Sequence, residues 1–100
     1  MTNSTGQPTS GARFQFTRKT HSPEQSVYNV EVFLPDQTLY YVATLTLENG
    51  LDTLTPKEET QAAAPEWAQK YIDFLCKQLH REAKKDGTWP RKLRQWKPEK

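Results

Sequence analysis

Alternation of apolar and polar residues in the middle of the chain constrains the fold most strongly. Between residues 39 and 47 every second residue is apolar, which places these side chains on one face of an extended strand. The apolar positions are Leu39, Tyr41, Ala43, Leu45 and Leu47. Residues 27–34 alternate in the same way. The sequence Pro35-Asp36-Gln37 between the two runs is typical of a tight turn, so the two predicted strands are antiparallel neighbours.

Two shorter strands complete the predicted sheet. Residues 13–17 alternate around Phe14 and Phe16. Residues 51–54 follow Asn49-Gly50, a dipeptide that favours a two-residue type I′ hairpin turn because both positions tolerate positive φ. In this order the strand from Phe14 to Thr17 lies at an edge of the sheet, where it can add to a sheet of another chain.

The pattern becomes helical after residue 55. The sequence Thr55-Pro56-Lys57-Glu58 has the form of a capping box and predicts a short helix to about residue 63. Because Pro65 interrupts a continuous helix, a longer helix is predicted from there to Asp86, with Gly87 as its C-terminal cap. Its apolar arc contains Trp67, Ala68, Tyr71, Ile72, Phe74, Leu75, Leu79 and Ala83. The helical spacing of Trp89, Leu93 and Trp96 predicts a short extra helix at the C-terminus.

These elements predict an α+β fold of two layers, in which an antiparallel four-stranded sheet is packed by one long C-terminal helix, in the order ββββα. One hydrophobic core serves a chain of 100 residues, so residues 12–100 are expected to form a single domain. Residues 1–11 are rich in Ser, Thr and Gly and are expected to form a disordered tail.

Composition excludes several classes of protein. The chain has no run of about 18 apolar residues, so we expect no membrane span. The polar first residues lack the apolar core of a secretory signal. A single cysteine cannot form an internal disulfide, which fits a reducing compartment. We therefore expect a cytoplasmic protein of bacterial type.

Charge is distributed unevenly along the chain. Residues 77–100 contain nine Lys or Arg and three acidic residues, whereas the preceding residues carry a net charge of −4. Such asymmetry indicates binding to nucleic acid or another anionic surface. The candidate residues for nucleic acid or a partner are Trp89, Arg91, Lys92, Arg94, Trp96 and Lys97. The basic residues would contact phosphates and the tryptophans would stack on unpaired bases. The same spacing also fits two tryptophans that anchor the C-terminus on the sheet.

A second candidate surface lies on the polar side of the predicted strands. Phe33, Tyr40 and Val42 fall on that side, where polar residues are expected. If exposed, they form a patch for a protein partner or for a second copy of the chain.

Catalytic and metal sites find little support. Cys76 and His80 lie four residues apart on the predicted helix, but a structural zinc site needs about four ligands and the sequence offers no others nearby. A mid-helix cysteine also lacks the surroundings that lower a thiol pKa. We therefore expect no enzyme activity, no metal and no cofactor.

The sequence thus favours a non-enzymatic module that binds another protein or forms a homodimer. The alternative is binding of single-stranded DNA or RNA through the basic, tryptophan-containing C-terminal segment. A third alternative is a small molecule bound between sheet and helix.

Overall fold

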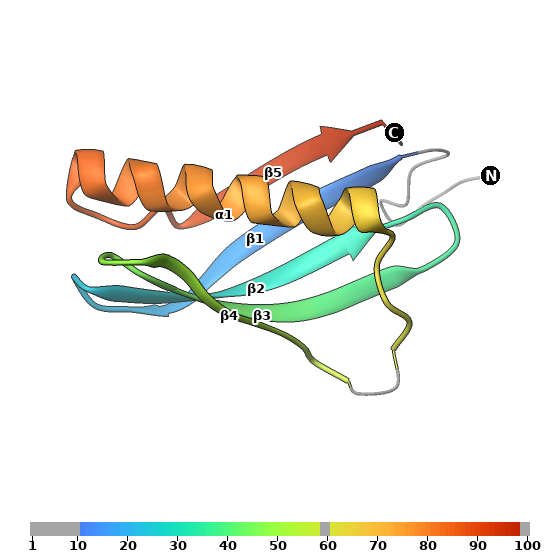
Figure 1. The fold of residues 1–100 in the computed structure, drawn as a ribbon, viewed down its shortest axis with the longest axis horizontal. Helices are drawn as coiled ribbons and strands as arrows, with labels where there is room; N and C mark the ends of the chain where they lie inside the picture. Colours follow the sequence, from blue (N-terminus) through green and yellow to red (C-terminus); the bar gives the residue numbers. More distant parts are fainter. Residues whose placement is uncertain (1–10, 59–60, 99–100) are drawn as a thin grey trace.

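A computed structural model describes residues 11–58 and 61–98 and shows an antiparallel five-stranded sheet with one helix across one of its faces (Figure 1). The strands are β1 (Ala12–His21), β2 (Gln25–Phe33), β3 (Thr38–Thr46), β4 (Gly50–Pro56) and β5 (Lys92–Lys97), and the helix is α1 (Glu66–Asp86). Their order across the sheet is β4-β3-β2-β1-β5. The predicted α+β architecture is confirmed, with one strand more than expected. The predicted tail lies, except for Gly11, outside the described residues.

The core forms between one face of the sheet and α1. Alternate residues of the three long strands are buried there, because each faces the helix while its neighbours face away. They include Phe14, Phe16, Tyr28, Val30, Val32, Leu39, Ala43 and Leu45. Aromatic contacts join the two layers: the rings of Phe14 and Tyr71 lie 5.0 Å apart. Burial of this face is the main source of stability.

The helix spans its predicted range, but Phe74, a member of the predicted apolar arc, is 50% exposed. Ala68, Ile72, Leu75, Cys76, Leu79 and Ala83 are buried against the sheet. Gly87 ends the helix with φ of 79°, and its N–H donates to the carbonyl of Ala83. The helix is amphipathic, and no helix among the described residues is long and apolar enough to cross a membrane.

The turn between β3 and β4 differs from the predicted one. Thr46 pairs with Gly50, so the loop contains three residues rather than two. Gly50 adopts φ of +83°, and a Cβ at this position would lie 3.3 Å from Nδ1 of His80. The glycine therefore permits both the turn and the close approach of the helix.

The predicted short helix after residue 55 is wrong for the described residues. Thr55 and Pro56 instead continue β4, opposite Val42 and Tyr41. Pro56 is compatible with a strand because β4 lies at the edge of the sheet. Gln61 then binds the backbone of Tyr40 with both ends of its side-chain amide, at 2.8 and 3.2 Å.

The predicted C-terminal helix is also wrong, since this segment forms β5. It pairs with β1 from Ala12↔Lys97 to Thr17↔Lys92. The segment forms a strand because of this tertiary pairing: without β5, β1 would leave a row of backbone donors and acceptors unpaired. The expectation that Phe14–Thr17 is an edge strand is therefore wrong as well, because β1 has neighbours on both sides.

Candidate functional site

The two candidate tryptophans have opposite environments. Trp89 is 2% exposed and belongs to the core, whereas Trp96 is 52% exposed on β5. Two hydrogen bonds hold the segment before β5: the Tyr28 hydroxyl donates to Pro90 O at 2.6 Å, and the Arg18 guanidinium donates to Trp89 O at 2.9 Å. Trp89 is thus an anchor, while Trp96 remains available for a ligand.

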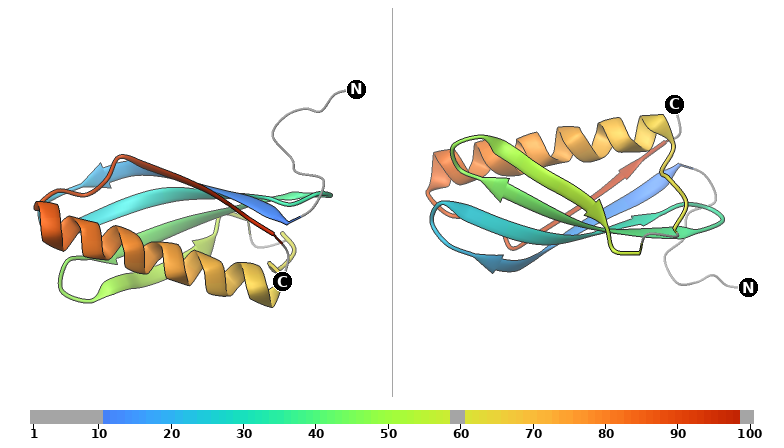
Figure 2. Two further views of the ribbon diagram at one scale, coloured as in Figure 1. Left: turned by 90° about the horizontal axis from the view of Figure 1, so that it is seen from above. Right: turned by 60° about the horizontal axis from the view of Figure 1, so that its bottom comes forward.

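The strands position Trp96 on the sheet face opposite α1, which we call the outer face. Successive views show no described element on this side (Figure 2). Its paired residues alternate with the buried ones along each strand. The outer face includes Arg13, Gln15, Thr17, Asn29, Glu31, Phe33, Thr38, Tyr40, Val42, Lys92, Arg94 and Trp96.

Strand register brings both candidate sets onto this one face. Trp96 lies opposite Arg13, and Arg13 lies opposite Phe33. In the next row along the strands, Arg94 lies opposite Gln15 and Tyr40 lies opposite Glu31. Because neighbouring strands are about 4.8 Å apart, residues three strands apart are separated by only about 14 Å.

The aromatic residues of the outer face are accessible to different degrees. Tyr40 is 40% exposed, and Phe33 and Val42 are half-buried by their neighbours. Trp96, Phe33 and Tyr40 come from three different strands and cross the sheet in two adjacent rows. The predicted sheet patch and the predicted tryptophan site are therefore parts of a single surface.

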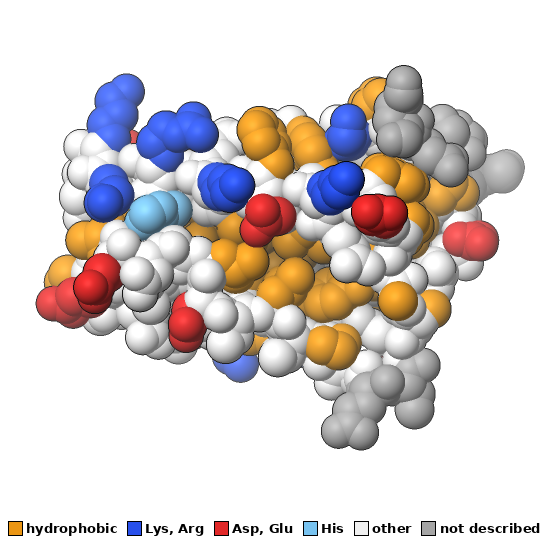
Figure 3. All heavy atoms as spheres, in the orientation of Figure 1, with side chains coloured by type: hydrophobic (Ala, Val, Ile, Leu, Met, Phe, Trp, Pro, Cys, Tyr) orange, Lys and Arg blue, Asp and Glu red, His pale blue; other side chains and the backbone are white. Residues whose placement is uncertain are grey.

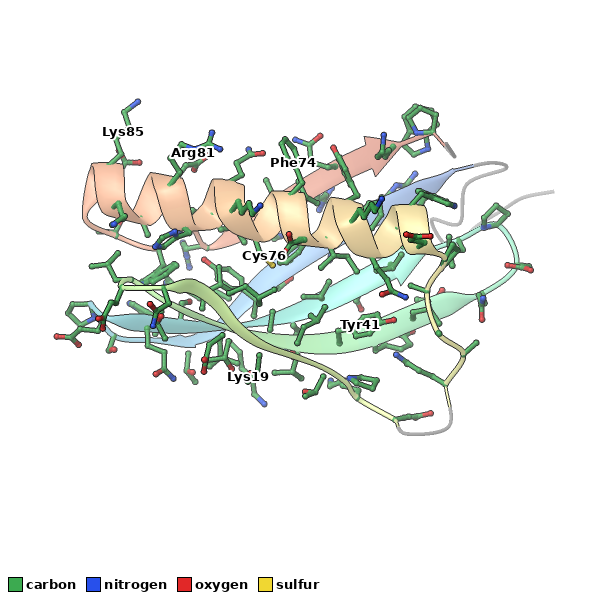
Figure 4. The ribbon with its side chains drawn as sticks, viewed as in Figure 1. Lys19, Tyr41, Phe74, Cys76, Arg81 and Lys85 are labelled. Atoms are coloured by element: carbon green, nitrogen blue, oxygen red, sulfur yellow. The ribbon has the colours of Figure 1, made fainter. Side chains whose placement is uncertain are left out.

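Positive charge dominates the outer face. Its paired positions include three cationic side chains, those of Arg13, Lys92 and Arg94, and one carboxylate, that of Glu31. Gln15 donates from Nε2 to Glu31 Oε1 at 3.2 Å. Lys19 adds a fourth cation, since its side chain points away from α1 (Figure 4).

Two of these cations, Arg13 and Lys19, were not among the candidate residues predicted from the sequence. Arg13 alternates with Phe14 and Phe16, a pattern that places it opposite the core. That pattern could have identified its face, but only the pairing of β5 with β1 brings Trp96 beside it. Lys19 lies at the β-bulge of β1, where the alternation is interrupted.

Besides the buried Trp89, two more predicted residues lie outside this cluster. Lys97 faces the helix side, with Nζ 5.2 Å from the centre of the Tyr71 ring. Arg91 precedes β5, and its carbonyl accepts a hydrogen bond from the Arg18 N–H at 2.9 Å. Arg91 and Lys92 line a cavity at the start of that strand.

The surroundings of Cys76 and His80 indicate that both residues have structural roles. Cys76 is buried, and burial raises the pKa of its thiol to about 12, which opposes formation of a reactive thiolate. His80 hydrogen-bonds through Nε2 to Leu47 O at 2.8 Å, so this nitrogen carries the proton. Within residues 11–58 and 61–98 no group of three potential metal ligands is present.

An apolar cavity of about 300 Å³ lies between β3, β4 and the start of α1. Hydrophobic side chains are visible between the helix and β4 in the space-filling view (Figure 3). The cavity corresponds in place to the predicted small-molecule site, and its volume is at the lower end for ligand pockets. Its lining residues are Tyr41, Leu54, Pro56, Gln61, Ala62, Ala63, Ala64, Gln69 and Ile72.

No protein-family model, curated protein or solved structure matches this chain. The function is therefore inferred from the geometry of the molecule. The outer face combines residues from both candidate sets, and its chemistry is more specific than that of the apolar cavity.

Proposed function

We propose that the protein binds single-stranded nucleic acid on the outer face of its sheet. The observation that carries this proposal is the exposed ring of Trp96, which lies opposite Arg13 and two residues from Arg94 on the same strand face. An aromatic ring beside guanidinium groups offers both a stacking surface and phosphate contacts.

The chemistry of the face suits unpaired bases. Single-stranded binders combine a positively charged surface that follows the phosphates with aromatic side chains on which bases stack. Here Trp96, Phe33 and Tyr40 provide the rings, and Arg13 and Arg94 lie in the same two rows. In a duplex the bases are already stacked on one another, so these rings favour a single strand.

Charge argues against self-association through this face. Two copies packed face to face would place four cations of each copy near those of the other, with Glu31 as the opposing carboxylate among the paired outward positions. Like charges held together without compensation oppose association. The outer face is instead complementary to an anionic partner.

A protein partner is the second candidate. Phe33, Tyr40 and Val42 form an apolar part of the outer face that would contact such a partner. The surrounding cations then require the partner to be acidic. This candidate shares the charge requirement of the first but does not need stacked bases.

A binding measurement separates these candidates. Fluorescence anisotropy of a labelled oligothymidylate of about 12 nucleotides, at about 50 mM salt, should show saturable binding to the whole chain. Trp96→Ala should weaken binding by about fivefold or more, because stacking contributes about 1–3 kcal/mol per base. The matched control is Phe74→Ala, since Phe74 is a similarly exposed aromatic residue, 50% exposed, on α1.

Four outcomes are decisive. Absence of binding at low salt contradicts the proposal, as does an unchanged affinity of the Trp96→Ala variant. If poly-glutamate of equal charge binds as tightly as the oligonucleotide, charge alone is recognised and an acidic protein becomes the favoured partner. An equal loss in the Phe74→Ala variant would place the bound strand elsewhere.

A further inference from the structure

A basic cavity of about 630 Å³ lies where β5 begins beside β1. Four of its six lining residues carry positive charge, and the described residues that line it include no Asp or Glu. They are Thr17, Arg18, Lys19, His21, Arg91 and Lys92. Lys92 and Trp96 lie four residues apart on β5, so the cavity is about 13 Å from the exposed ring.

One cation of the cavity is held in place. Arg18 donates through a guanidinium nitrogen to Trp89 O at 2.9 Å, and its backbone N–H donates to Arg91 O. A guanidinium has several N–H donors, so this bond leaves others free for a ligand. The hydroxyl of Thr17 is a further possible donor at the cavity wall. These groups together form a site suited to an oxyanion.

The charge of the cavity favours a doubly charged ligand. A phosphate monoester carries a charge of about −1.5 to −2 at neutral pH, whereas each phosphodiester within a strand carries a single negative charge. Attraction to a fixed cluster of cations grows in proportion to the charge of the ligand. The monoester also has more terminal oxygens available as hydrogen-bond acceptors.

We propose that the cavity binds the terminal phosphate of a nucleic-acid strand whose neighbouring bases lie on the outer face. This inference rests on the proposed function and makes it more specific: the protein binds phosphorylated strand ends in preference to hydroxyl ends. Lys92 belongs to both the cavity and the outer face, so the two surfaces are continuous.

The test compares three oligothymidylates of equal length with a 5′-phosphate, a 3′-phosphate or hydroxyl groups at both ends. The strand with the recognised phosphate should bind about tenfold more tightly than the hydroxyl strand. In the Arg91→Gln variant this preference should fall to about twofold or less. The control is Arg81→Gln, because Arg81 is exposed on α1 away from the sheet (Figure 4) and should retain the full preference.

The outcomes distinguish the two proposals. Equal affinity for all three strands overturns the terminal-phosphate site and leaves binding on the outer face intact. A preference that survives Arg91→Gln places the phosphate outside this cavity and also overturns the inference. If none of the strands binds, the proposed function itself is contradicted, and this inference fails with it.

Discussion

The two faces of the sheet are formed by the same strands yet differ in almost every physical property. The face toward α1 carries buried aliphatic and aromatic residues such as Phe16 and Leu45. The outer face carries Trp96 and Tyr40 in partly exposed positions, together with cations. Trp89 and Trp96 show the contrast within one short segment, since the first is buried and the second is exposed. One face therefore supplies stability, and the other is free to bind.

The largest expected effect is a difference in stability between variants of the two faces. Phe16→Ala removes a fully buried ring and should lower the free energy of unfolding by about 3–5 kcal/mol. Trp96→Ala should lower it by no more than about 1 kcal/mol, because half of that side chain is already exposed. Urea denaturation measures both. If Phe16→Ala does not fold, Phe16→Leu provides a smaller loss of the same sign; equal losses at both sites would contradict the contrast.

The charge of the outer face predicts a strong dependence of binding on salt. Contacts of Arg13, Lys19, Lys92 and Arg94 with about four phosphates give a slope of about −2.8 in a plot of log K against log salt. Affinity should then fall about fiftyfold between about 50 and 200 mM salt. Arg94→Gln should reduce the magnitude of the slope by about 0.7, whereas Lys85→Gln on α1 should leave it unchanged. A flat salt dependence would exclude these contacts.

A smaller loss of stability is expected when the hydrogen bond that holds the segment before β5 is removed. The Tyr28 hydroxyl fixes Pro90 ahead of β5, so Tyr28→Phe should lower the free energy of unfolding by about 1–2 kcal/mol. Hydrogen exchange should also become faster in β5, because this strand loses one of its anchors. Tyr40→Phe is the control on the outer face and should change stability by less than about 0.5 kcal/mol. An identical exchange pattern in Tyr28→Phe and the parent protein would argue against this anchor.

The smallest expected effect is a loss of stability that appears only at alkaline pH. Burial raises the pKa of Cys76 from 9.0 to about 12 and raises the pKa of Tyr28 above 10.0. The folded state therefore holds these protons more firmly than the unfolded state, and stability should decline as the pH rises above about 9. Urea titrations across this range should show a shallower decline for Cys76→Ala. A decline of equal steepness in that variant would contradict the role of this thiol.

Much of the sheet face toward α1 was predictable from periodicity alone. The alternation around Leu39 and the helical arc around Ile72 each bury one face, and the structure confirms both except at Phe74, which is half exposed. The capping-box pattern at Thr55 failed because pairing with Val42 continues the strand. Local helix signals were outweighed there by backbone hydrogen bonds to a neighbouring strand.

The candidate site was predictable only in pieces. Trp96 and Phe33 could both be named from the sequence, but 62 intervening residues separate them along the chain. Their proximity depends on β5 returning to β1, a long-range pairing that the spacing of Trp89, Leu93 and Trp96 did not indicate. The same spacing fits a helix face, so tertiary pairing rather than local pattern decided the outcome.

The three tryptophans provide the most direct test of binding on the outer face. Their indole N–H groups give separate signals in a ¹⁵N–¹H NMR spectrum, and Trp67, Trp89 and Trp96 report on α1, the core and the outer face respectively. Titration with oligothymidylate at low salt should shift the Trp96 signal strongly and leave the other two nearly unchanged. A spectrum in which Trp96 stays fixed while Trp67 shifts, or in which no indole signal moves, would contradict binding on the outer face.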